Sequence, residues 1–275
     1  MTTGKDYSEE RADAVFAELG EVLITLGEYR TCIYVVGGWV PFLATSEVKT
    51  VIPNVRSLDI DLLVDPSSVP EAAYERIRTL LERRGFRPDP DHPHRMVKTV
   101  PVREDPSFTV ALDLLAPEEG GTARSRRHQR IQDIRLRKIR GGGLVPENCE
   151  TRRIEFRTAS GGNRVVEVRF ASPLAFLVMK AAAVRDRGGE KDAYDVAYLM
   201  RHHPLGLDAI RGEIVRRRSH PLVREALRTL HEAFEDVDSF GTVAAMGFER
   251  FSDPGETERL KRRIVEIFRT LTEGS

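Results

Sequence analysis

Hydrophobic residues near the start of the chain follow two different spacings. Between residues 7 and 29 they recur every three or four positions, which predicts an amphipathic helix that packs on one side. Residues 32–36 form a short β-branched run, which predicts a strand ending at Gly37 and Gly38. A new helix is expected over residues 39–43, because a proline falls in its first turn.

Further sheet signals continue to about residue 170. Residues 58–64 and 108–115 predict strands on either side of a helix at 69–82. A hairpin is expected from residues 153–157 and 164–170, since Ser-Gly-Gly-Asn between them tolerates positive φ. These elements indicate a mixed α/β region.

The rest of the chain has a helical pattern. Ser172 and Pro173 form an N-cap and first-turn pair for a helix through residue 184, and further helices are expected, including residues 193–200 and 256–271. We therefore predict an α/β domain at residues 1–171 and a helical domain at 172–275.

Composition narrows the class of protein. Of 275 residues, 40% are hydrophobic and 31% charged, as in globular proteins. The two cysteines lie in no metal-ligand spacing, and the longest apolar stretch is interrupted by Lys180, so we expect neither structural zinc nor a membrane association. A polar start without a signal peptide favours the cytoplasm.

Three aspartates stand inside apolar strand patterns. Asp59 and Asp61 flank Ile60, and the period of two directs both carboxylates to one face. Asp113 lies in the later strand. Buried anions are costly without a cation, and Mg²⁺ prefers carboxylate and phosphate oxygens, so we expect two Mg²⁺ ions, with Mn²⁺ as an alternative.

The glycine turn supplies a second kind of chemistry. At Gly37 and Gly38 no Cβ keeps an anion away from backbone N–H groups at the start of a helix, so a phosphate could bind there. Each motif alone is more often a turn or a solvated strand edge. Their order along the chain is more informative than either motif.

That order, a strand, Gly-Gly, a helix, Arg-Ser-Leu-Asp-Ile-Asp and a third Asp, resembles the polymerase-β-like nucleotidyltransferase superfamily over residues 31–115. The resemblance implies an α+β nucleotidyltransferase fold with a small mixed sheet and flanking helices. It implies nucleotide binding by Gly37, Gly38 and Ser57, and metal binding and catalysis by Asp59, Asp61 and Asp113. Two features depart from the family. Members of the family often have Ser at the position of Gly38, and the stretch from Gly38 to Asp59 is longer than is typical, which an insertion at 46–54 would explain.

The helical half resembles AbiEii-type toxins of bacterial toxin–antitoxin systems. The resemblance rests on Ser172-Pro173-Leu174, Lys180, Arg185, Arg187 and the run Lys191-Asp192-Ala193-Tyr194-Asp195. It implies a helical domain that closes the active-site cleft, with Lys180 contacting the triphosphate and Asp192 near the acceptor. Surface ion pairs among these charges remain an alternative.

The acceptor is the least determined feature. The resemblance and a basic run that includes Arg124, Arg126, Arg127 and Arg130 favour transfer of a nucleoside monophosphate from a nucleoside triphosphate to the 3′ end of tRNA, although a solvated basic helix explains the run equally well. A cognate antitoxin is a further expected partner. Trp39 echoes small-molecule (aminoglycoside-type) enzymes, so a small-molecule acceptor, a protein acceptor and a catalytically silent nucleotide-binding protein stay open.

Overall fold

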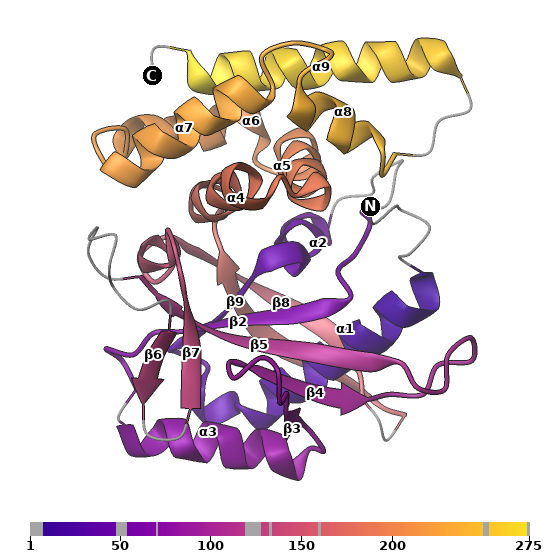
Figure 1. Ribbon diagram of the computed structural model, residues 1–275, viewed down its shortest axis with the longest axis vertical. Coiled ribbons are helices and arrows are strands. Elements are labelled where there is room, and N and C mark those ends of the chain that lie inside the picture. Colours follow the sequence, from indigo (N-terminus) through magenta and orange to yellow (C-terminus); the bar gives the residue numbers. More distant parts are fainter. Residues whose placement is uncertain are drawn as a thin grey trace. The chain divides into compact units, whose positions relative to one another are not determined.

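A computed structural model shows how these elements are arranged (Figure 1). It describes residues 8–47, 54–69, 71–118, 128–131, 134–158, 161–249 and 253–273, with the backbone alone at 71–75, 128–131 and 134. The chain forms two compact units: Tyr7–Val40 with Arg56–Ala171, and a helical unit made of Pro41–Val55 and Ser172–Ser275, together with the first six residues. Residues 41–47, 54 and 55, which the sequence analysis assigned to the first domain, thus group with the helices.

The first unit is built on a mixed sheet. Within the described residues it has nine strands: β3, β4, β5, β2, β1, β9 and β8 in that order, with β7 paired to β5 and β6 to β7. Strand β2 is antiparallel to β1 and parallel to β5. The bounds are β1 Ile33–Val36, β2 Asp59–Val64, β3 Arg87–Pro88, β4 Arg95–Thr99, β5 Thr109–Pro117, β6 His128–Ile131, β7 Ile134–Ile139, β8 Cys149–Arg157 and β9 Asn163–Ala171.

Two helices, α1 (Glu9–Thr25) and α3 (Glu71–Arg83), contact this sheet, with α1 against β2, β8 and β9 and α3 against β7 (Figure 1). On α1, Phe16 packs its ring on Phe156 of β8 with centroids 4.7 Å apart, and Gly20 lies against the same ring. Alternation along the paired strands places Ile60 and Leu62 on this face, where both are fully buried. The aspartates of β2 therefore point from the opposite face.

The second unit is helical. Ser172 caps α4 through its hydroxyl, which accepts from the N–H of Ala175, and Phe234 stacks on Phe268 at 3.8 Å in its core. Its helices are α4 Pro173–Arg187, α5 Glu190–His202, α6 Gly206–Arg216, α7 Pro221–Ala233, α8 Phe240–Met246 and α9 Pro254–Thr272, and α2 (Val40–Thr45) begins at the boundary between the units. In the part of the chain that the structure describes, no helix is long and apolar enough to span a bilayer.

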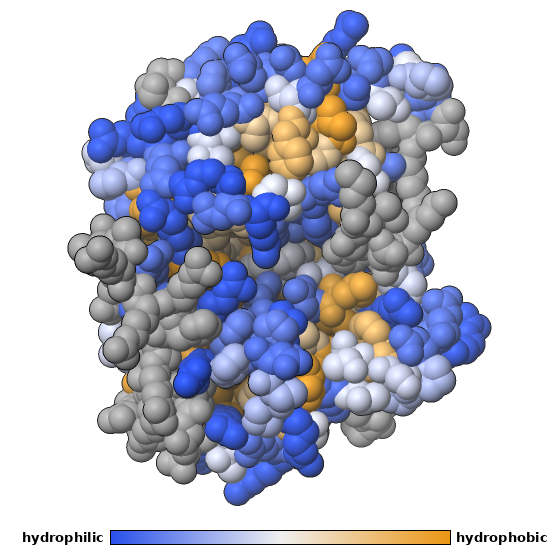
Figure 2. All heavy atoms as spheres, in the orientation of Figure 1, coloured by the Kyte–Doolittle hydropathy of each residue, from blue (hydrophilic) through white to orange (hydrophobic). Residues whose placement is uncertain are grey.

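The α+β fold with a mixed sheet and a helical C-terminal part is confirmed, and two local features differ from the prediction. The basic run that includes Arg124 and Arg130 was considered as a solvated helix, whereas its described residues form the strands β6 and β7. The short strands β3 and β4 were not predicted, because their alternation is brief. Figure 2 shows a mainly hydrophilic face with scattered hydrophobic areas, as burial of apolar side chains in each unit requires.

Candidate active site

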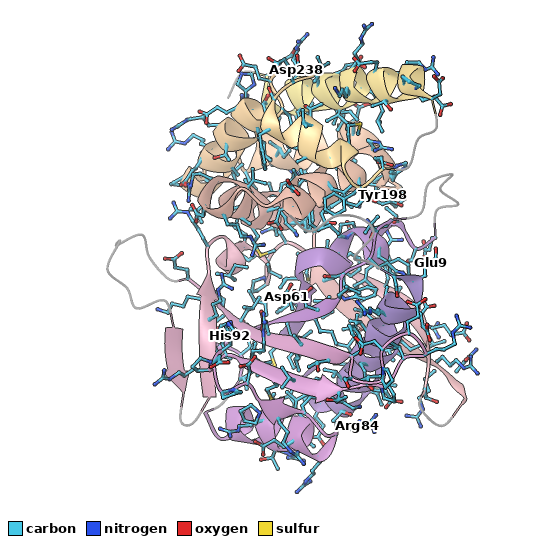
Figure 3. All side chains as sticks on the ribbon, turned by 45° about the vertical axis from the view of Figure 1, so that its right-hand side comes forward. Glu9, Asp61, Arg84, His92, Tyr198 and Asp238 are labelled. Atoms are coloured by element: carbon cyan, nitrogen blue, oxygen red, sulfur yellow. The ribbon has the colours of Figure 1, made fainter. Side chains whose placement is uncertain are left out.

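The three predicted acids lie on adjacent strands. Asp61 of β2 stands directly opposite Asp113 of β5, and Asp59 stands opposite Ala111 (Figure 3 labels Asp61). Paired residues of a parallel sheet share a face, so all three carboxylates project from the face opposite α1. Asp59 and Asp61 are half-buried, and Asp113 is only 4% exposed. The strand patterns alone left open whether the strands of Asp61 and Asp113 are neighbours, and the register shows that they are.

An arginine that the sequence analysis missed binds the third acid. Arg95 of β4 pairs with Asp113 across the sheet and donates two hydrogen bonds to its carboxylate, from Nε at 2.7 Å and from a terminal nitrogen at 3.0 Å. The hydrogen bonds to Asp113 raise the pKa of Arg95 although burial opposes the shift, and the negative charges of Asp113 and Asp59 add to the rise. Asp113 is therefore neutralised by a protein cation in this structure.

The glycine turn lies against the second acid. Gly37 has φ of +68°, in the left-handed region, and a Cβ at this position would collide with the Asp61 carboxylate. Glycine is needed here both for the backbone conformation and for the close approach. The next residue, Gly38, is buried in the 3-10 turn Gly37–Trp39. The two predicted motifs are thus brought together.

Trp39 has a structural role. Its side chain is fully buried and stacks on Phe16, and the indole N–H donates to the backbone carbonyl of Asp59 at 2.8 Å. Ser57, which is also buried, donates its hydroxyl hydrogen to a carboxylate oxygen of Asp59. The indole and the hydroxyl hold the backbone and the side chain of Asp59, respectively, so both residues orient this acid.

The other predicted residues form a cluster in the helical unit. Lys180 of α4 is 8% exposed and donates to Asp192 at 2.7 Å and to Asp195 at 2.9 Å, both on α5. Arg187 donates two hydrogen bonds to the other oxygen of Asp192, and Lys191 donates to Asp195. Fixed partners therefore surround both carboxylates.

Burial and charge compete in this cluster. Burial alone would raise the pKa of Asp192, but the positive charges of Lys180 and Arg187 outweigh it and lower the pKa. Burial would lower the pKa of Lys180, and the two carboxylates raise it instead. Both groups thus stay charged.

These contacts bear on the alternative of surface ion pairs. Asp192 and Asp195 do pair with basic residues, but in a buried setting, since Asp195 is 0% exposed. Arg185, by contrast, binds Asp186 and Glu225 in a half-exposed position. A buried cluster differs from a solvated helix surface, because each charge depends on its partner.

The expected RNA-binding residues are only partly described. Arg124, Arg126 and Arg127 lie outside the described residues, and Arg130 is described only as backbone, in β6. In β7, Arg135 and Arg137 are exposed on either side of the buried Leu136.

The register places those two arginines on the face of the acids. Arg137 stands opposite Leu115 of β5, two residues beyond Asp113, in a parallel pair. Alternation along both strands therefore directs Arg135 and Arg137 from the same sheet face as Asp113.

The arrangement fits a divalent cation in part. The described residues include no group of three or more His, Cys, Asp or Glu side chains arranged to hold a metal. Mg²⁺, however, commonly uses one or two carboxylates together with substrate phosphates and water. Asp59 and Asp61 could supply those two carboxylates, whereas Asp113 is bound by Arg95.

Comparison with known families identifies the chain. The family described as nucleotidyl transferase AbiEii toxin, type IV toxin–antitoxin system, matches residues 55–274. The chain belongs to this family. It is therefore a nucleotidyltransferase, and the family's type IV system suggests a nucleotide substrate and an antitoxin partner. No curated protein matches the chain.

The AbiEii match covers some of the candidate residues and leaves others outside it. It includes Asp59, Asp61 and Asp113 as well as the helical cluster, and it begins after Gly37 and Gly38. Gly37 is therefore linked to the acids by its close approach to Asp61, and Gly38 only by its place in the same turn.

Proposed function

We propose that this AbiEii-family enzyme uses Mg²⁺ to transfer a nucleoside monophosphate from a nucleoside triphosphate to the 3′ end of tRNA, as a toxin acting in the cytoplasm. The observation that carries the proposal is the pair Asp59 and Asp61 on one face of β2, with the Gly37 turn against Asp61. Two half-buried like charges side by side favour binding of a cation.

Each group at the site has a task in this reaction. Asp59 and Asp61 would hold the metal, which when bound would offset negative charge on the phosphates and lower the pKa of the attacking hydroxyl. Backbone N–H groups at Gly37 and Gly38 bind the phosphates. The acceptor oxygen forms a bond to the α-phosphorus as the bond to pyrophosphate breaks, so catalysis consists of positioning and charge stabilisation.

Asp113 is bound by Arg95 and acts in one of two ways. It is a third metal ligand if Arg95 releases it when nucleotide arrives, and otherwise it anchors Arg95 near the phosphates. We retain Lys180 as a triphosphate contact and Asp192 as an acid near the acceptor. In that role, Lys180 exchanges a carboxylate partner for a phosphate oxygen.

The exposed arginines of β7 support an RNA acceptor. Arg135 and Arg137 project from the face that carries the acids, and clustered arginines bind RNA phosphates with release of counterions. The rival small-molecule acceptor drew its support from Trp39. That residue is a fully buried core side chain bonded to the backbone of β2, so it offers no contact to a small substrate.

The proposal is tested by transfer of label from each α-³²P nucleoside triphosphate, with Mg²⁺ and total RNA. Wild type is compared with Asp59→Asn, Asp61→Asn and the matched control Asp238→Asn, an exposed residue in the turn before α8 (Figure 3). We expect label in tRNA with wild type and the control, and none with the two site variants or with EDTA. Label on another RNA, a protein or a small molecule would reject the tRNA acceptor, and activity in both site variants would reject the metal site.

A further inference from the structure

Strand β9 extends well beyond its neighbour β1. The two strands are parallel, and Val35 stands opposite Phe170, so Ile33, the first residue of β1, falls opposite Val168. Residues Asn163 to Glu167 precede this point and pair with β8 on one side only, as far as the described strands show. Every second residue there directs its backbone N–H and C=O away from β8. The open edge is about 16 Å long at ~3.3 Å per residue.

A groove follows this open edge. It has a volume of about 310 Å³ and lies within the first unit, between the C-terminal end of α1 and the start of β9. Its apolar lining includes Leu23 and Ile24 from α1 and Val165 and Val166 from β9. Val165 is 55% exposed, so its side chain is available for an apolar contact. The groove thus offers strand edge and apolar contact together.

The charge of the groove is one-sided. Three arginines, Arg30, Arg164 and Arg169, line it together with one acid, Glu167. No carboxylate in the described part of the chain forms an ion pair with any of the three. Arg169 donates to the carbonyl of Thr31 and stacks over a tyrosine ring, so its charge is oriented without being neutralised.

We infer that the open edge of β9 binds an extended segment of a protein partner that carries carboxylates at alternating positions. The segment adds a strand beside residues Asn163 to Glu167 and pairs with the free backbone groups. Its carboxylates meet Arg30 and Arg164, and its apolar side chains cover Val165 on the opposite face of the sheet. Unpaired edges usually carry charges that prevent such pairing, but here three arginines outnumber the one acid, which favours an acidic strand.

The test uses the full chain and a synthetic acetylated seven-residue peptide that alternates Glu and Val. Backbone hydrogen–deuterium exchange is followed over β9, and affinity is measured by fluorescence anisotropy. We expect the peptide to slow amide exchange at residues Asn163 to Glu167 by about tenfold or more. We expect Arg30→Glu with Arg164→Glu to weaken binding by about tenfold or more, while Arg211→Glu, the same charge change on the exposed surface of α6, has no effect. Nucleotidyl transfer stays unchanged in the double variant and in the control.

Two control peptides test the specificity of binding, and two alternative ligands of the groove, tRNA and a second copy of the chain, are distinguished from the peptide. A peptide with Lys in place of Glu, and one with N-methylated backbone amides that cannot donate, should not bind. Equal binding of either, or no protection of β9 by the acidic peptide, would overturn the inference. Protection of β9 by total tRNA but not by the peptide would assign the groove to nucleic acid, and a dimer of the chain alone with β9 protected would assign the edge to a second copy. Both results would also overturn it.

Discussion

Gly37 lies so close to Asp61 that a Cβ on the glycine would collide with a carboxylate oxygen. Gly37→Ala should therefore displace Asp61 and strain the backbone, since φ is +68°. We expect a loss of about 1–2 kcal/mol in the free energy of unfolding and loss of nucleotidyl transfer. Urea denaturation and the labelling assay measure the two effects.

Gly143→Ala is the matched control, because a Cβ there meets nothing within 4 Å. It should leave stability and activity close to wild type. Full activity of Gly37→Ala would show that the turn does not set the position of Asp61.

Arg135 and Arg137 are expected to bind the RNA acceptor. Reversing both charges with Arg135→Glu and Arg137→Glu should raise the KM for tRNA about tenfold or more and reduce its salt dependence, because fewer counterions are released. The KM for nucleoside triphosphate should change little. Steady-state kinetics at several salt concentrations, with Arg211→Glu as control, measure this effect, and identical salt slopes would exclude these arginines as phosphate contacts.

Arg95 and Asp113 should be coupled in stability. Arg95→Ala leaves a nearly buried carboxylate without its cation, so we expect a loss of about 2 kcal/mol or more in the free energy of unfolding. The double variant Arg95→Ala with Asp113→Asn should lose less free energy of unfolding than the two single variants lose in sum. A double-mutant cycle by urea denaturation measures the coupling, and additive effects would contradict the bidentate pair.

The contrast between Asp61 and Arg95 shows what the sequence could reveal. The common face of Asp59 and Asp61 follows from local strand geometry, which needs only the period of two. The contact between Arg95 and Asp113 joins residues 18 positions apart and depends on the register of two strands. The alternation of apolar and polar residues in β4 is too short to predict a strand, so neither the strand nor the role of Arg95 could be predicted from the sequence.

Trp39 illustrates the same limit in another way. Its position after Gly38 echoed the Gly-Gly-Trp of small-molecule nucleotidyltransferases, although core packing is the more common role of a Trp there. Its actual partners, Phe16 and the carbonyl of Asp59, are set by how α1 and β2 pack. Helices and strands with a sustained hydrophobic period were predicted, since that period is a local property, whereas the short strands β3 and β4, the strands β6 and β7 and the partners of polar groups were not.

Lys180 should be essential for the stability of the helical unit. Lys180→Met removes the cation shared by Asp192 and Asp195, and we expect a loss of about 3 kcal/mol or more in the free energy of unfolding. Arg185→Ala, which breaks half-exposed pairs, should cost less than about 1 kcal/mol. Urea denaturation compares the two.

A direct role of Lys180 in nucleotide binding requires a second measurement on the same variants. Asp195→Asn should also destabilise the helical unit, but it keeps the ammonium group. If Lys180 contacts the triphosphate, Lys180→Met raises the Kd for nucleotide by more than Asp195→Asn does, under conditions where both variants are folded. Equal affinity in the two variants would restrict Lys180 to a structural role.

His202 should make stability depend on pH. Burial, helped by the charge of Arg201, lowers the pKa of His202 to about 4 from its ordinary value of 6.5. Between these values the unfolded chain binds a proton that the folded chain does not, so the free energy of unfolding rises as pH increases from about 4 to 6.5. His202→Phe, which keeps an aromatic ring beside Tyr198, should flatten this slope, while His92→Phe on an exposed loop should not. Urea denaturation at half-unit pH steps measures the slope, and an unchanged slope in His202→Phe would show that another group is responsible.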